Sequence, residues 1–458
     1  MRLQLSSGTA LLAALGLLLP APGCTPPGPD DSTVRPPGEV SVPPPPAAAA
    51  LLEEVYPEVR APGLESRTFS PESWWEVVEP MVRGSDELRM EEVGQSAEGR
   101  ALRLVSFGTG PVPVLLWSQM HGDESTASMA LADLFRWVAE DPDHPFLREL
   151  ASRLTIHVIP ILNPDGAARF QRRNAQGVDI NRDARALATP EGRTLKEVRD
   201  RVEPAFGFNL HDQAVGTRVG RTDRGTAIAL LAPPFNEARD INPVRRQAME
   251  VAAVMRTALE PHVGGYMARW DDTFNPRAFG DLMTAWGTST ILVESGGWEG
   301  DPEKQFLRGM NFIGILTALD AIASESHRDY PVELYSSLPE NGRRVGDLLI
   351  RDARIAVPGL TPLPGDVLVN FQHPLAERGG RWADIGDLRE TEARDTVFAG
   401  GLYLVPLEEG LQRARDGTGA QLAPGAPAHF VLSRDPEGRD VVWEVRGDVD
   451  PEWRRPRL

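Results

Sequence analysis

Residues 112–124 have the sequence VPVLLWSQMHGDE. Residues 112–117 are apolar and uncharged, which is typical of a strand buried on both faces of a sheet. A polar cluster that contains His121 and Glu124 follows directly. Open α/β sheets place their sites at the carboxyl ends of their strands. The stretch therefore predicts a strand of an α/β sheet with a site at its end.

Similar segments extend outward from this stretch in both directions. Apolar runs predict further strands at residues 102–107, 154–162, 205–210, 227–231 and 288–293. Apolar residues at helical spacing predict helices at residues 124–140, 243–259 and 302–322. Strands that alternate with helices in this way are typical of an α/β domain whose central sheet is covered by helices. We assign this domain to residues 51–325.

The pattern changes in the last part of the chain. Short apolar segments are separated by turns that contain glycine and proline, and helical periodicity is largely lost. This pattern predicts a small β-rich C-terminal domain over residues 326–458. The residue types of this domain indicate no particular chemistry, so its role stays open.

The first 24 residues have the features of an export signal. The apolar run at residues 10–19 is too short to span a bilayer but has the length of a signal-peptide core. Cys24 is the only cysteine, and with the preceding Ala21-Pro22-Gly23 it resembles the lipidated cysteine of bacterial lipoproteins. The alternative is an ordinary cleaved signal with an incidental cysteine. We expect an exported protein, periplasmic or at the cell surface, that is lipid-anchored to a bacterial membrane through Cys24.

Composition limits the partners of the remaining chain. Residues 25–50 are rich in proline and alanine, which is typical of an extended linker. The formal net charge of −18 opposes the approach of nucleic acid or of an anionic membrane surface. We therefore expect no nucleic-acid partner, and contact with a membrane only through the lipid anchor.

His121 and Glu124 have the residue types and the spacing of two zinc ligands, although such a pair is also common by chance. Catalytic zinc commonly binds two histidines and one glutamate and keeps a fourth position for water. His211 lies at the end of the apolar strand predicted at residues 205–210. The other histidines lie within a strand or stand alone in loops. His211 is therefore the best candidate for the third ligand.

Glu294 closes another apolar run and is followed by Ser295-Gly296-Gly297. A carboxylate at the end of a buried strand is costly unless it is paired or takes part in a reaction. One interpretation is a general base that acts on a zinc-bound water and then delivers the proton to the leaving amine. The alternative is a helix-capping or salt-bridged glutamate.

Several motifs of this sequence resemble those of the zinc carboxypeptidase family in content and in order. They are the His-Gly-Asp-Glu cluster at 121–124, Asn-Pro-Asp-Gly at 163–166, Arg-Arg-Asn at 172–174, Gly-Val-Asp-Ile-Asn-Arg at 177–182, His211 and Glu294. The resemblance covers about residues 65–325. It implies an α/β fold with a mixed sheet, one Zn²⁺ ion per chain, and hydrolysis of the amide bond next to a free carboxylate.

The resemblance also implies a role for individual residues. It makes His121, Glu124 and His211 the zinc ligands and Glu294 the acid that activates water. It makes Arg172 the arginine that polarises the scissile carbonyl, with Arg173 as the alternative in register.

Three more residues take roles from the same resemblance. Asn181 and Arg182 are implied to bind the terminal carboxylate of the substrate, and Asp179 to orient the His121 imidazole. The tyrosine that caps the substrate in the family has no clear counterpart, because Tyr266 lies too far upstream of Glu294. Arg269 and Arg277 are the candidates to supply donors instead.

The expected function is that of a zinc carboxypeptidase acting on peptides, or on cell-wall peptides if the protein faces the periplasm. One alternative is a deacylase of small N-acyl amino acids. A related branch of the family shares the His-x-x-Glu pair and the asparagine–arginine pair that binds the substrate carboxylate. Another alternative is a non-catalytic surface binding protein. The preferred side chain of the substrate is not indicated by the sequence.

Overall fold

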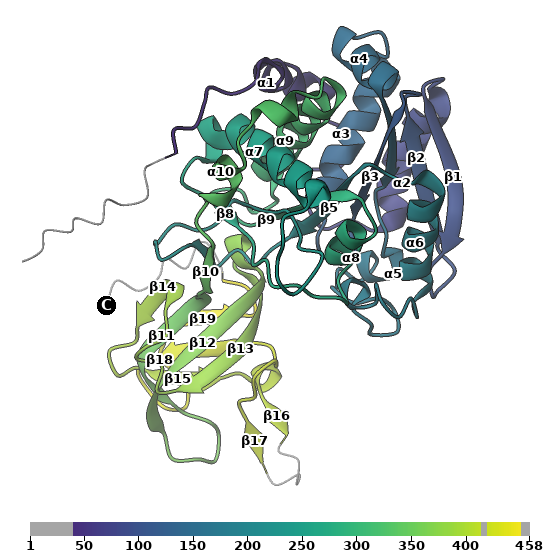
Figure 1. Ribbon diagram of the computed structural model, residues 1–458. Coiled ribbons are helices and arrows are strands. Elements are labelled where there is room, and N and C mark those ends of the chain that lie inside the picture. Colours follow the sequence, from purple (N-terminus) through teal and green to yellow (C-terminus); the bar gives the residue numbers. More distant parts are fainter. Residues whose placement is uncertain (1–39, 414–418, 450–458) are drawn as a thin grey trace, which may run out of the picture. The chain divides into compact units, whose positions relative to one another are not determined.

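The computed structural model describes residues 40–413 and 419–449 (Figure 1). All described residues from Val42 onward belong to one compact unit. The predicted signal peptide, Cys24 and residues 25–39 of the predicted linker lie outside the described residues.

A sheet of eight strands forms the centre of the α/β part. In spatial order its strands are β1 (Leu88–Gln95), β2 (Ala101–Phe107), β4 (Leu154–Ile159), β3 (Val112–Ser118), β5 (Phe206–Asp212), β9 (Ser289–Ser295), β7 (Ile228–Leu231) and β8 (Met267–Arg269). The pairs β4–β3, β3–β5 and β5–β9 are parallel, whereas β1–β2, β2–β4 and β9–β7 are antiparallel. The prediction of a mixed central sheet is therefore confirmed. Because β3, β5 and β9 run in the same direction, their carboxyl ends meet at one edge of the sheet.

Helices cover both faces of this sheet (Figure 1). They are α1 (Ala47–Val59), α2 (Pro71–Gly84), α3 (Thr126–Glu140), α4 (Pro145–Arg153), α5 (Pro164–Ala167), α6 (Pro190–Val202), α7 (Pro243–Val263), α8 (Phe279–Ala285), α9 (Gln305–Ala323) and α10 (Val332–Ser336). On one face α6 and α8 contribute Leu195, Val198, Phe279 and Met283 to a core that includes Trp117 of β3. On the other face α9 packs against both α3 and α7. Although α9 is long and apolar enough to cross a membrane, 83% of its apolar window is buried inside the fold.

The ends of two predicted elements differ from the structure for local reasons. The strand expected at residues 154–162 ends at Ile159, because the next residue is Pro160, which has no amide to donate to a neighbouring strand. The helix expected from residue 302 begins at Gln305, because Lys304 takes a left-handed conformation with φ of 53°.

The N-terminal boundary also differs. Helix α1 begins at Ala47, so the linker boundary drawn at residue 50 falls inside this helix. Ala49 and Leu52 are both fully buried in the core. The alanine-rich end of the predicted linker is therefore helical, and the helix that contains it packs against α9.

The change to β structure occurs later than residue 326. The segments η2 (Ser326–Asp329) and α10 pack against α7, and the backbone amide of Ala232 donates to the Tyr335 hydroxyl (3.1 Å). Strand β10 (Asn341–Arg344) pairs with β6 (Thr217–Val219) of the α/β part. Residues 326–344 therefore pack with the α/β part, and the β-rich part begins near Val345.

The β-rich part contains a second sheet around its own core. The strands are β11 (Gly346–Ile355), β12 (Leu363–His373), β13 (Arg378–Gly386), β14 (Ala393–Phe398), β15 (Tyr403–Pro406), β18 (His429–Ser433) and β19 (Val441–Arg446), beside the short pair β16 (Gln412–Arg413) and β17 (Ala420–Gln421). Trp382, Phe430 and Trp443 lie at the centre of the core between them. The prediction of a β-rich C-terminal part is confirmed.

Candidate active site

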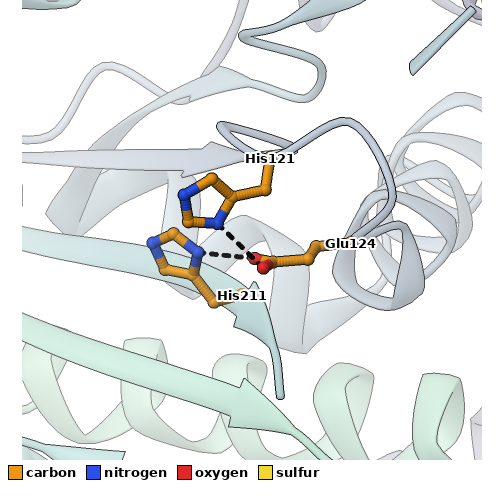
Figure 2. Close-up of side chains that lie close together, drawn as sticks. All are labelled: His121, Glu124 and His211. Carbon is orange, nitrogen blue, oxygen red and sulfur yellow. Dashed lines mark hydrogen bonds and ion pairs between the residues drawn. The ribbon is translucent and has the colours of Figure 1, made fainter. Parts of the chain in front are cut away.

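His121, Glu124 and His211 come together at the carboxyl ends of two neighbouring strands (Figure 2). His121 and Glu124 lie in the loop between β3 and α3, and His211 is in β5, which pairs in parallel with β3. The loop turns sharply at Gln119, whose φ is 45°. The side-chain amide of Gln119 donates to the backbone carbonyl of Gly122 (3.0 Å). Burial of both strands thus places residues that are far apart in the sequence side by side.

The three side chains face one another at close range. The Nδ1 atom of His121 lies 2.8 Å from Oε1 of Glu124, and the Nδ1 atom of His211 lies 2.6 Å from Oε2 (Figure 2). One atom from each residue fits within 4.8 Å of the other two, and all three residues are buried. On the far side of the His121 ring, Nε2 lies 3.0 Å from Oδ1 of Asp179.

This arrangement fits a single zinc ion. Two imidazole nitrogens and a carboxylate form a donor set that catalytic zinc prefers. A carboxylate on the far nitrogen fixes the tautomer and orientation of a ligating imidazole, which is what Asp179 does to His121. The three predicted ligands are thus close together, and Asp179 lies next to the His121 ring.

The charges around His121 favour a cation at this position. Burial alone would lower the pKa of His121, but the negative charge of Glu124 and hydrogen bonding to Asp179 and Glu124 raise it to about 9. Burial likewise opposes ionisation of Glu124, yet the two histidines hold its pKa well below the usual range. The Glu124 carboxylate therefore remains ionised, and it attracts positive charge to the space between the two histidine rings.

Glu294 lies beside this triad on the neighbouring strand β9, where it is the register partner of His211. Burial, followed by the charges of Glu124 and Asp212, raises the pKa of Glu294 well above its usual value. Among the residues that the structure describes, Glu294 forms no ion pair. This placement disfavours the alternative of a salt-bridged glutamate, and β9 continues past it to Ser295, so it does not cap a helix.

Arg172 reaches the same site from a loop. Two of its nitrogens lie 3.0 and 3.1 Å from Oδ2 of Asp179, and a third lies 3.2 Å from Oε1 of Glu124. The Arg172 side chain is 43% exposed and lines the cleft. Arg173 instead donates to the carbonyl of Gly177 (3.0 Å) and does not line the cleft. The structure therefore favours Arg172 over Arg173 as the arginine of the site.

Asn181 and Arg182 form the wall next to Arg172. They belong to the short helix η1 (Ile180–Arg182). The Asp179 side chain accepts a hydrogen bond from the backbone amide of Asn181 (3.0 Å). The Asn181 side-chain oxygen accepts the amide of Phe279 at the start of α8 (3.0 Å). Arg182 donates to the carbonyl of Asn181 (2.7 Å). Asp179 therefore positions both the His121 ring and the turn that carries this pair.

These residues line one cleft of about 630 Å³. Of the predicted residues, it is lined by His121, Glu124, Arg172, Asn181, Arg182 and Glu294. Further residues that no motif predicted also line the cleft, among them Arg67, Lys304, Trp270 and Phe274 from the α/β part and Phe371 and Gln372 from the β-rich part. Their surrounding sequence has no motif, and only the fold brings them to the cleft.

The expected substitutes for the missing tyrosine do not line the cleft. Arg269 pairs with Glu340 (2.7 Å), and Arg277 donates to the carbonyl of Arg182 (3.3 Å). Tyr266 packs against Trp298, with ring centroids 5.0 Å apart. The expectation for Arg269 and Arg277 is therefore corrected, because the wall at this point is formed by residues of the loop 270–275.

Part of the chain is similar to known zinc carboxypeptidases. The model of the zinc carboxypeptidase family, peptidase M14, matches residues 76–213, which include all three predicted ligands. Carboxypeptidase 2 of Trichophyton rubrum is 25% identical over 236 residues, which are 47% of this chain and 43% of that protein. Carboxypeptidase SOL1 of Arabidopsis thaliana is 29% identical over 102 residues, 21% of each protein. Over residues 76–213 the chain is therefore similar to the zinc carboxypeptidase family.

The matches cover the relatives only in part. The chain spans 43% of the length of the first of these relatives and 21% of the second. Among solved structures, the metallo-carboxypeptidase from Burkholderia cenocepacia is 19% identical, with a TM-score of 0.44, and the match covers 57% of this chain and 71% of that chain.

Proposed function

We propose that this protein is a zinc-dependent carboxypeptidase that hydrolyses the amide bond next to the free C-terminal carboxylate of a peptide. The observation that carries the proposal is the buried His121–Glu124–His211 triad with Glu294 beside it on the neighbouring strand. The match of residues 76–213 to the zinc carboxypeptidase family supports the same reaction. Cell-wall peptides are included as substrates if the protein faces the periplasm.

Each side chain of the site has a defined task in this reaction. The Nδ1 atoms of His121 and His211 and the carboxylate of Glu124 would hold zinc, which when bound polarises a carbonyl and acidifies water. Glu294 accepts the proton of the attacking water and passes it to the leaving amine nitrogen, as a carboxyl of raised pKa can do.

The arginines bind the substrate. Arg172 directs its guanidinium into the cleft, where it stabilises the negative charge that develops on the scissile carbonyl oxygen. Arg182 and Asn181 bind the terminal carboxylate, because a guanidinium fork and an amide match its two oxygens. The requirement for a free carboxylate follows from this pair.

The test is release of the C-terminal amino acid from a peptide and from its C-terminal amide. We expect the full chain with one equivalent of zinc to release the amino acid from the free acid and not from the amide. A chelator should abolish release, and added zinc should restore it. Peptides that end in a D-residue extend the test to cell-wall substrates.

The alternatives predict different results in the same assay. Faster hydrolysis of small N-acyl amino acids than of peptides would make the protein a deacylase. Binding of peptide without hydrolysis by the zinc-loaded chain would make it a binding protein.

We further propose that the protein is exported and anchored to a bacterial membrane by a lipid on Cys24. The motif at residues 21–24 supports this proposal. Expressed in a bacterium, the wild type should sediment with membranes, and Cys24→Ser should move it to the soluble fraction. Ser32→Ala, outside the motif, is the matched control and should stay with the membranes. Membrane association of Cys24→Ser equal to that of the wild type would refute the anchor.

A further inference from the structure

Lys304 is a buried charge in the cleft that the proposed reaction does not use. Its side chain is 2% exposed, and it precedes α9 in a left-handed conformation that is uncommon for lysine. Its ammonium donates to Oδ2 of Asp212 (3.0 Å) and to the backbone carbonyl of Ser295 (2.9 Å). A buried ammonium is costly unless it is paired and hydrogen-bonded, so these two acceptors determine where it lies.

The two acceptors are the last residues of the two strands that carry the reacting groups. Asp212 follows His211 at the end of β5, and Ser295 follows Glu294 at the end of β9. The strands are parallel here, and Asp212 is the register partner of Ser295. The Lys304 ammonium therefore joins the ends of β5 and β9 directly beyond His211 and Glu294.

Asp212 also contacts Glu124, another of the proposed zinc ligands. Its backbone amide donates to Oε2 of Glu124 (3.2 Å), and its carboxylate accepts the Thr126 hydroxyl at the start of α3 (2.7 Å). The orientation of Glu124 thus depends on Asp212, whose position is held by Lys304. A shift of this pair would move two ligands and the general base together.

A second buried ion pair on α9 shows what a purely structural pair looks like in this fold. Arg308 donates to Asp133 (2.8 Å), and both side chains are fully buried. Its other bonds go to the carbonyls of Ala61 and Leu64 and to the side-chain oxygen of Gln305, and it does not line the cleft. Both pairs carry the cost of desolvation, but only the Lys304 pair touches residues of the site.

We propose that Lys304 is a positioning residue of the zinc site: through Asp212 and the Ser295 carbonyl it holds His211, Glu124 and Glu294 in the geometry that binds the metal. The inference rests on the zinc site of the proposed function. Its first readout, zinc affinity, does not require turnover.

The experiment compares two neutralised pairs in the full chain, Lys304→Met with Asp212→Asn and Arg308→Met with Asp133→Asn. Each double variant removes both charges, so neither leaves an unpaired buried ion. We expect the first to weaken zinc binding about 10- to 100-fold, the loss that follows removal of a ligand's outer partner. The second should lower Tm and leave zinc affinity at the wild-type value. Competition with a chromophoric chelator measures the affinity.

Kinetics provide the second readout. The first double variant should lower kcat and leave KM unchanged at saturating zinc, because Lys304 does not touch Asn181 or Arg182. Wild-type zinc affinity and kcat in that variant, or an equal loss of affinity in both double variants, would overturn the proposal. A wild type that binds zinc but releases no amino acid would refute the proposed function and leave the affinity test intact.

Discussion

Glu294→Gln is expected to lower kcat about a thousandfold, within the range that general acid–base catalysis contributes. Glutamine has nearly the same shape as glutamate but cannot accept the proton of the attacking water. The zinc content should stay at one ion per chain, because Glu294 is not one of the three grouped ligands. Steady-state peptide hydrolysis together with metal analysis measures both quantities.

The matched control for this variant is Glu299→Gln. Glu299 is exposed and follows β9 by a few residues. It should keep the wild-type kcat and zinc content. Wild-type turnover in Glu294→Gln would remove Glu294 from its proposed role, and loss of zinc in that variant would make it a structural support of the metal site.

Arg182→Met is expected to raise KM for a free-acid peptide about 100-fold, since loss of one partner of a buried charged pair costs a few kcal/mol. Methionine retains much of the arginine stem but offers no donor to the substrate carboxylate. Because zinc and Glu294 are not altered, zinc content should be unchanged. Hydrolysis of the free acid and of its amide, measured side by side, should show that the preference for the free acid is lost.

Arg185→Met is the matched control for Arg182→Met. Arg185 is exposed on the same loop and does not line the cleft. It should keep the wild-type KM and the preference for the free acid. If Arg182→Met retained that preference, the terminal carboxylate would have to be bound by another residue, and Arg67 would be the first to test because it lines the same cleft.

The sheet was predictable because its strands are locally distinctive. The segments at β3, β5 and β9 are largely apolar, and His121, His211 and Glu294 lie at or just after their carboxyl ends. Helices α1, α2 and α6 were not predicted. An internal proline, Pro57 in α1 and Pro80 in α2, indicates a helix break in the sequence, and α6 is mostly polar. The β-rich part was predicted because its short strand-like segments are separated by turns that contain glycine and proline.

The residue types of the site and their order along the chain could be read from the sequence. His121, Glu124 and His211 could be chosen because zinc accepts few ligand types, and Asp179 because of the family resemblance; the structure brings all four together. Only the tertiary structure decided between Arg172 and Arg173, excluded Arg269, and revealed the Lys304–Asp212 pair, whose members are 92 residues apart. The physical reason is that burial in a shared core, and not any local pattern, sets which distant side chains meet.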